Sequence, residues 1–150
     1  PFVEFTRCED QFAPFKEYHS NLDNPELMDE ERMDEIFNVM KSVIYILENN
    51  AYVLRKFDGL ICLSNPEYDL YMERPDPTEN KGFADDSEKW GHLLDCLFRY
   101  LDGNMTILDI AQKHSLPFAA LYNYLKKFEE KGLIKLKRAE IDKRVVKQFY

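Results

Sequence analysis

The strongest constraint on the fold is the order of apolar periods in residues 87–137. Three successive segments repeat apolar residues at helical spacing, and a fourth alternates apolar and polar residues as a strand does. The first helix is expected to begin at Ser87 and the second at Thr106, which acts as its cap. The third is expected to follow a turn at residues 114–117. Gly132 ends the third helix. Helix, helix, tight turn, helix and strand is typical of a winged helix-turn-helix domain, with residues 145–150 as the predicted partner of strand 133–137.

A further amphipathic helix is predicted upstream of this domain. Its apolar residues form an unbroken i, i+3, i+4, i+7 series: Met33, Ile36, Phe37, Met40, Val43, Ile44 and Leu47. Such a stripe faces a core. The helix begins either at Asn24, with Pro25 in the first helical position, or one turn later at Asp29. Acidic residues crowd residues 29–35, where they complement the positive end of the helix and indicate a solvated helix start, not a metal cluster.

Short strand patterns flank this helix. Residues 2–6 alternate like a strand and are followed by a polar loop to Asn24. After the helix, residues 52–57 and 60–63 are joined by Asp58-Gly59, a pair that favours the tight turn of a β-hairpin. Residues 64–86 combine several prolines with many charges and are expected to form an irregular connector. We therefore expect three parts, with boundaries at 1–50, 51–86 and 87–150.

Charge is divided unequally along the chain. Residues 1–103 hold 10 Lys and Arg against 23 Asp and Glu, whereas residues 104–150 hold 10 against 5. The two halves thus carry net charges of -13 and +5, which indicates two modules with different surroundings. Three widely spaced cysteines indicate free thiols in a reducing, cytoplasmic compartment. No apolar run is long enough to span a membrane.

The best-placed histidine for chemistry is His19. It lies in the polar loop Glu17-Tyr18-His19-Ser20-Asn21-Leu22-Asp23-Asn24, which brings an imidazole, a carboxylate and an amide together within six residues. His92 and His114 fall instead within or beside helical patterns. From spacing alone, His19 is more simply a loop histidine bonded to a neighbouring backbone group.

The same loop resembles the last metal-ligand loop of a bacterial family of zinc aminopeptidase-like proteins. These are co-catalytic zinc exopeptidases with a phosphorylase/hydrolase-like α/β core and a C-terminal winged helix-turn-helix. Further similarity lies in residues 108–111 (Leu-Asp-Ile-Ala) and 129–134 (Glu-Glu-Lys-Gly-Leu-Ile). The resemblance implies a mixed α/β, mostly helical chain: the last strand, ligand loop and helix of the core, followed by the winged domain. Ser20 stands where the family has a threonine.

The resemblance also implies a site. His19 corresponds to the family's final zinc ligand, while the other ligands and the general base are expected upstream, in a longer gene product. Asp23 is a candidate to hold the imidazole, or else it forms a turn that starts the helix. Arg7 and Tyr18 are candidates to line a substrate pocket. The implied function is hydrolysis of peptide or amide bonds. Because relatives occur among genes for surface polysaccharides, an amide of a modified sugar is also a possible substrate.

Two alternatives to a hydrolase remain. One is a DNA-binding regulator, in which Asn123, Lys126 and Lys127 of the third helix and the basic residues of the wing contact phosphates. Against it, the third helix begins with Ala119 and Ala120 and carries no Arg or Gln to read bases. The other is a non-catalytic interaction module. Charge favours docking of the basic module on the acidic one or on another subunit, with homo-oligomerisation through the winged helix.

Overall fold

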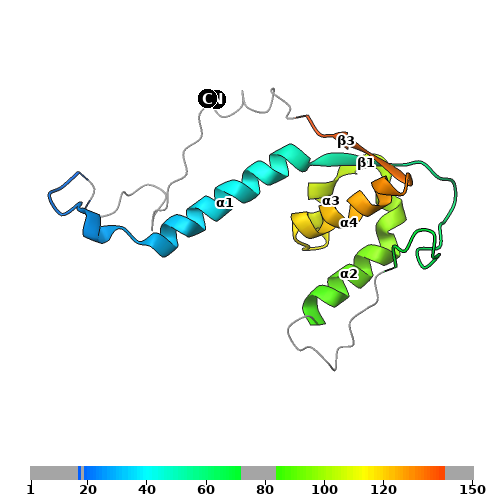
Figure 1. Cartoon of the computed structure of the whole chain (residues 1–150), viewed down its shortest axis with the longest axis horizontal. Coiled ribbons are helices and arrows are strands. Elements are labelled where there is room, and N and C mark those ends of the chain that lie inside the picture. The colour runs from blue at the N-terminus through cyan, green and yellow to red at the C-terminus, as the bar shows by residue number, and fades with distance from the viewer. Residues whose placement is uncertain (1–16, 18, 72–83, 141–150) are drawn as a thin grey trace. The chain divides into compact units, whose positions relative to one another are not determined.

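The computed structural model describes residues 17, 19–71 and 84–140, and its contacts divide the chain into two units, Pro1–Tyr45 and Ile46–Tyr150. The described residues form a mixed α/β structure with more helix than strand, as the sequence predicted (Figure 1). The predicted strands at residues 2–6 and 145–150 lie outside the described residues. Both therefore stay predictions.

The first unit contains the 3-10 helix η1 (Pro25–Leu27) and most of the long helix α1 (Glu30–Asn49). Both predicted starting points are used. The Asn24 side chain accepts a hydrogen bond from the Glu26 N–H and begins η1, whereas Asp29 accepts from the Arg32 N–H just before α1. Neither η1 nor α1 contains a buried residue.

The second unit is built on a three-stranded antiparallel sheet in the order β2-β1-β3. The strands are β1 (Ala51–Arg55), β2 (Asp102–Thr106) and β3 (Ile134–Arg138). Val53 faces Leu136 on one neighbour, and Tyr52 faces Thr106 on the other. The middle strand thus comes before the other two strands and before the helices of residues 84–130.

The expected hairpin at residues 52–63 is wrong. Gly59 does adopt a positive φ of 73°, so the chain turns there, but residues 60–63 form no strand. The reason is that both edges of β1 are already occupied, by β2 and by β3. The segment after the turn instead folds onto the helices. Leu70 is buried, and its carbonyl accepts a 2.8 Å hydrogen bond from the Tyr124 hydroxyl.

Four helical segments follow β1 in the described part of the chain. They are α2 (Ala84–Cys96), η2 (Leu97–Tyr100), α3 (Ile107–Lys113) and α4 (Phe118–Glu130). Helix α2 begins three residues before the predicted start at Ser87. The Thr106 cap is confirmed as a capping box with Asp109, and Gly132, with φ 71°, follows the end of α4. Ser115 makes the turn between α3 and α4 with φ 52°.

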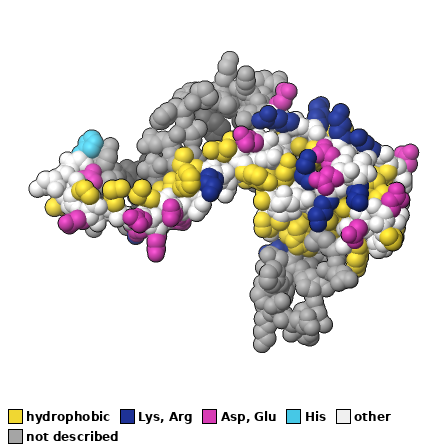
Figure 2. Space-filling model, viewed as in Figure 1, with side chains coloured by type: hydrophobic (Ala, Val, Ile, Leu, Met, Phe, Trp, Pro, Cys, Tyr) yellow, Lys and Arg dark blue, Asp and Glu magenta, His cyan; other side chains and the backbone are white. Residues whose placement is uncertain are grey.

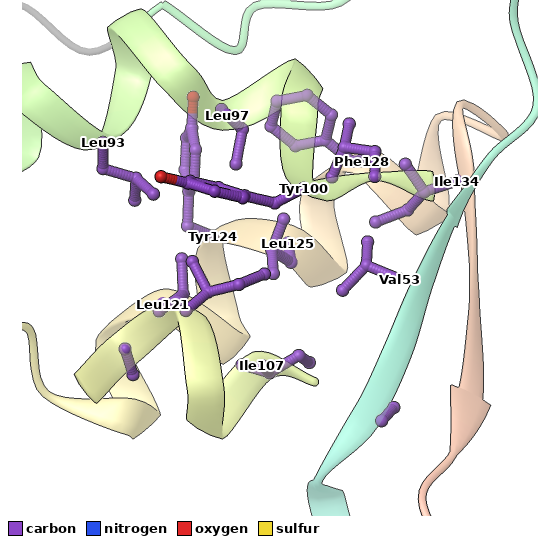
Figure 3. Packing of buried hydrophobic residues seen from close by; sticks show 14 of the residues in the cluster. Val53, Leu93, Leu97, Tyr100, Ile107, Leu121, Tyr124, Leu125, Phe128 and Ile134 are labelled. Atoms are coloured by element: carbon purple, nitrogen blue, oxygen red, sulfur yellow. The ribbon is translucent and has the colours of Figure 1, made fainter. Parts of the chain in front are cut away.

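The core of the second unit lies between the sheet and these helices (Figure 3). Val53 and Ile134 from the sheet, and Leu97 and Phe128 from the helices, are fully buried. Tyr124 packs edge-on against Phe128, with ring centroids 5.2 Å apart. Because the strand residues complete this core, β1 belongs structurally to the helical module that follows it.

Candidate metal-ligand loop

The loop around His19 is a chain of short-range hydrogen bonds centred on Ser20. The Ser20 N–H and hydroxyl both donate to the Glu17 carbonyl, at 3.0 and 2.7 Å. The hydroxyl oxygen also accepts from the Leu22 N–H at 3.1 Å, and the Ser20 carbonyl accepts from the Asp23 N–H at 3.2 Å. The serine side chain therefore shapes the loop. A threonine hydroxyl could make the same bonds.

His19 occupies the turn in a left-handed backbone conformation, with φ 57°, and its side chain is exposed. Non-glycine residues rarely adopt positive φ, and those that do commonly lie in turns or functional sites. The hydrogen bonds of Ser20 on either side hold this conformation. The His19 side chain is therefore exposed on a turn that is fixed by hydrogen bonds of the neighbouring serine.

Asp23 lies in the same turn, four residues after His19, with an exposed side chain. It is the backbone of Asp23, through its bond to Ser20, that takes part in the loop. The residue that begins the following helix is Asn24, not Asp23: its amide donates to the Leu22 carbonyl while its oxygen caps η1. A role for Asp23 in holding the imidazole stays a prediction.

The described residues do not by themselves form a metal centre. No group of three or more His, Cys, Asp or Glu side chains gathers in residues 17, 19–71 and 88–140, whose side chains the structure describes. Arg7 and Tyr18, the candidate pocket residues, lie outside these ranges. The acidic residues at the start of α1 are exposed, as expected for a solvated helix start. The chemistry of the loop fits one ligand contributed to a zinc site, not a complete coordination shell.

Helix α4 offers a weakly basic surface. The exposed residues of α4 include Ala119, Ala120, Asn123 and Lys127. Lys126 forms a salt bridge with Glu129, in which Nζ lies 2.6 Å from Oε2. That contact raises the pKa of Lys126 and lowers the pKa of Glu129. The exposed residues of helix α4 thus include Asn123 and Lys127 as potential DNA contacts, but no Arg or Gln that could read base edges.

Sequence reasoning missed two polar side chains that connect distant segments. The Asn50 side chain accepts from the Leu108 N–H at 3.0 Å, which ties the start of β1 to α3. Glu129 accepts from the Leu136 N–H at 3.0 Å, which ties α4 to β3. No contact with a distant segment was predicted for Asn50, and Glu129 was noted only as part of the similarity in residues 129–134. Neither contact has a local sequence signal, because the partners are 58 and 7 residues away.

Comparison with known proteins gives one structural relative. Neither a known family nor a curated protein matches the sequence. Among solved structures, the chain is similar to one described as a "putative peptidase" from Clostridium acetobutylicum, with 22% sequence identity and a TM-score of 0.52. The similarity covers 81% of this chain but 24% of that protein. The chain thus shares a fold with about a quarter of a larger protein.

Separately, none of the described helices combines the length and apolar character needed to cross a membrane.

Proposed function

We propose that this chain is the C-terminal region of a zinc-dependent, aminopeptidase-like hydrolase of the cytoplasm. In this proposal His19 supplies one zinc ligand, and the remaining ligands and the general base belong to polypeptide upstream. The observation that carries the proposal is the likeness to the peptidase structure, which extends over 81% of this chain. That extent exceeds either structural unit alone, so the similarity reaches into both units.

The His19 loop supports a ligand role through its geometry. The imidazole is exposed on a turn whose conformation is fixed by Ser20, so little ordering is needed when a metal binds. Asp23, in the same turn, is the candidate partner for the second ring nitrogen. Zinc bound here would polarise the scissile carbonyl and lower the pKa of a water molecule. The loop's own contribution is to present the histidine in one orientation.

The C-terminal module is proposed to be a winged helix-turn-helix that docks on protein. The order α2, β2, α3, α4 and β3 supports this assignment. One feature is unusual: β3 pairs with β1, a strand that comes from before helices α2, α3 and α4. The exposed alanines of α4 and the pairing of Lys126 with Glu129 favour a protein partner over duplex DNA.

Zinc content and hydrolysis in the longer parent protein test the proposal. The His19→Ala variant is expected to lose most bound zinc, measured by mass spectrometry of the metal, and to lose amidase activity at least 100-fold. His92→Ala is the matched control, because His92 is exposed on α2 and pairs with Glu88 at 3.7 Å. If His19→Ala keeps the full zinc content and rate, the ligand assignment is wrong.

The module's partner is tested with the intact chain. Titration with a duplex oligonucleotide at low salt is expected to show no saturable binding. Tight binding that weakens steeply as salt rises would favour the regulator instead. In that case Lys127→Ala should weaken binding, whereas Lys41→Ala, on α1, should not.

A further inference from the structure

Strand β3 lies at an edge of the three-stranded sheet, and no other strand of the described residues lies on its outer side. The Lys56 N–H donates to the Leu133 carbonyl at one end of the ladder with β1, and the Ala139 N–H donates to the Asn50 carbonyl at the other. In an antiparallel ladder the backbone-bonded pairs alternate, so the N–H and carbonyl of Leu136 point away from β1. The outer edge of β3 therefore presents backbone groups that can pair with a further strand.

The side chains along this edge alternate between two kinds. Lys135 and Lys137 are exposed on one face, whereas Ile134 is buried and Leu136 is half-buried against the core on the other. Neither lysine forms a salt bridge within the described part of the chain. Figure 2 shows Lys and Arg side chains gathered along the margin of the second unit where Figure 1 places β3. The edge is thus cationic on one face and apolar on the other.

One backbone donor of this edge already has a side-chain acceptor. The Leu136 N–H donates to Glu129 Oε1 at 3.0 Å, and Oε2 of the same carboxylate lies 2.6 Å from Lys126 Nζ. Glu129 therefore supplies the acceptor that the carbonyl of a neighbouring strand would supply. Because Lys126 also holds this carboxylate, Glu129 can give up the Leu136 N–H without becoming an unpaired charge.

We propose that the outer edge of β3 binds an extended segment of a partner protein in which acidic and apolar side chains alternate. The segment adds a strand to the sheet, and one of its carbonyls replaces Glu129 as the acceptor for Leu136. Its acidic side chains lie beside Lys135 and Lys137, and its apolar side chains lie beside Leu136. This inference rests on the proposed docking of the C-terminal module on protein, and it names the surface and the chemistry of the partner.

Charge complementarity determines which strand fits this edge. Opposite charges on neighbouring strands attract, and like charges directly opposite each other destabilise the pair. A second copy of β3 would place Lys135 opposite Lys137, so self-pairing of this edge is disfavoured. An acidic strand instead pairs with both lysines.

Titration of the 150-residue chain with a synthetic peptide that alternates glutamate and valine tests the proposal. Saturable binding is expected, with a change in the chemical shift of the Leu136 amide in NMR spectra. Lys135→Glu and Lys137→Glu should each weaken binding about tenfold, because an attractive pair becomes a repulsive one. Lys127→Glu is the matched control, since it makes the same change of charge at an exposed position on α4 and should leave binding unchanged.

Methylation of the peptide backbone separates strand addition from simple charge attraction. The valine residue opposite Leu136 exchanges backbone hydrogen bonds with it, whereas the amides of the glutamates point away from β3. Methyl groups on the valine amides should therefore abolish binding. Methyl groups on the glutamate amides should leave it intact, although both peptides carry the same charge.

The outcomes separate this proposal from the proposed function. Equal binding of the two methylated peptides, or no binding of the unmethylated one, would overturn strand addition but leave docking through another surface such as α4. Nuclear Overhauser contacts between Leu136 and residues 145–150 in the free chain would also overturn it, because the chain's own C-terminal segment would then be the occupant. Saturable binding of duplex DNA would instead remove the docking role on which the proposal rests.

Discussion

The N–H of Leu136 on β3 donates a 3.0 Å hydrogen bond to Oε1 of Glu129 on α4. Leu136 faces Val53 in the ladder between β1 and β3. The backbone hydrogen bonds that Ala139 and Lys56 make at the two ends of this ladder set its alternation, and they make Leu136 and Val53 a pair that exchanges no backbone hydrogen bond. The Leu136 N–H consequently points away from β1, toward the outer edge of the sheet. The carboxylate of Glu129 thus accepts a hydrogen bond from an edge N–H that could otherwise pair with another β-strand.

Removal of this carboxylate should destabilise the second unit. Glu129→Ala deletes both the acceptor for Leu136 and the partner of Lys126, and is expected to lower the free energy of unfolding by about 1–2 kcal/mol. Glu129→Gln keeps an acceptor oxygen and should cost less than half as much. Urea denaturation followed by circular dichroism measures both. Glu130→Ala, an exposed neighbour, serves as control, and a cost equal to that of Glu129→Ala would contradict the assignment.

The pH dependence of stability should show the same contact. The hydrogen bond from Lys126, and then that from the Leu136 N–H, lower the pKa of Glu129 in the folded state. As the pH falls, Glu129 therefore becomes protonated in the unfolded chain before it does so in the folded chain. The contribution of Glu129 is complete above its unfolded pKa of about 4.3 and is lost as the pH falls through the lower folded pKa. Denaturation between pH 6 and pH 3 should show a shallower loss of stability in Glu129→Gln than in the native chain.

His114 should titrate below the usual range for histidine. Burial chiefly, and then the positive charges of Lys113 and His92, lower the pKa of His114, whose Nε2 lies 3.1 Å from the Tyr100 hydroxyl. The stabilisation that neutral His114 provides is complete above the pKa of about 6.5 that histidine has in the unfolded chain. It decreases as the pH falls below that value. Proton NMR titration should place the His114 midpoint lower than 6.5. Lys113→Ala should move that midpoint upward, and no movement would exclude a contribution from Lys113.

Tyr124 should remain neutral in alkaline solution. Burial raises its pKa to about 12, and its hydroxyl donates to the Leu70 carbonyl. Because the unfolded tyrosine ionises near pH 10, stability should fall as the pH rises from about 10 to 12. Tyr124→Phe removes this alkaline loss and costs about 1 kcal/mol at pH 7. Absorbance of tyrosinate against pH, with Tyr71→Phe as an exposed control, measures the difference.

Local patterns predicted the helices well because their signals are short-range. The capping box at Thr106, the glycine after α4 and the two starts near α1 all depend on residues within four positions of each other. The strand after Gly132 was likewise placed within one residue, as β3 begins at Ile134. Each of these elements is encoded by side chains that contact their own backbone.

Strand pairing was not predictable in the same way. Asp58-Gly59 favours a hairpin locally, yet β1 pairs with segments about 50 and 80 residues further along the chain, because those pairings also bury Val53 and Ile134. The candidate site has the same difficulty. Ser20 could be identified as a hydroxyl beside His19, but the left-handed turn that it stabilises depends on backbone geometry that composition does not encode.

The position of β1 leads to the last prediction, which concerns the true boundary of the C-terminal module. A fragment of residues 46–150 is expected to unfold cooperatively, whereas residues 87–150 should not, because β2 and β3 then lack the strand that lies between them. Val53 is fully buried, so Val53→Ala should lower the free energy of unfolding by about 2 kcal/mol. Tyr52→Ala, on the exposed side of the same strand, should cost less than half of that.

Thermal melts by circular dichroism compare the two fragments, and urea titration compares the two substitutions. A cooperative melt of residues 87–150 at the temperature of the longer fragment would show that β1 is dispensable. Added residues 46–71 as a separate peptide should restore cooperative unfolding to the short fragment, since they supply both the middle strand and Leu70, whose carbonyl holds Tyr124. Substitution of Val53 by Asp in that peptide should abolish the rescue, because a charge would then face the core.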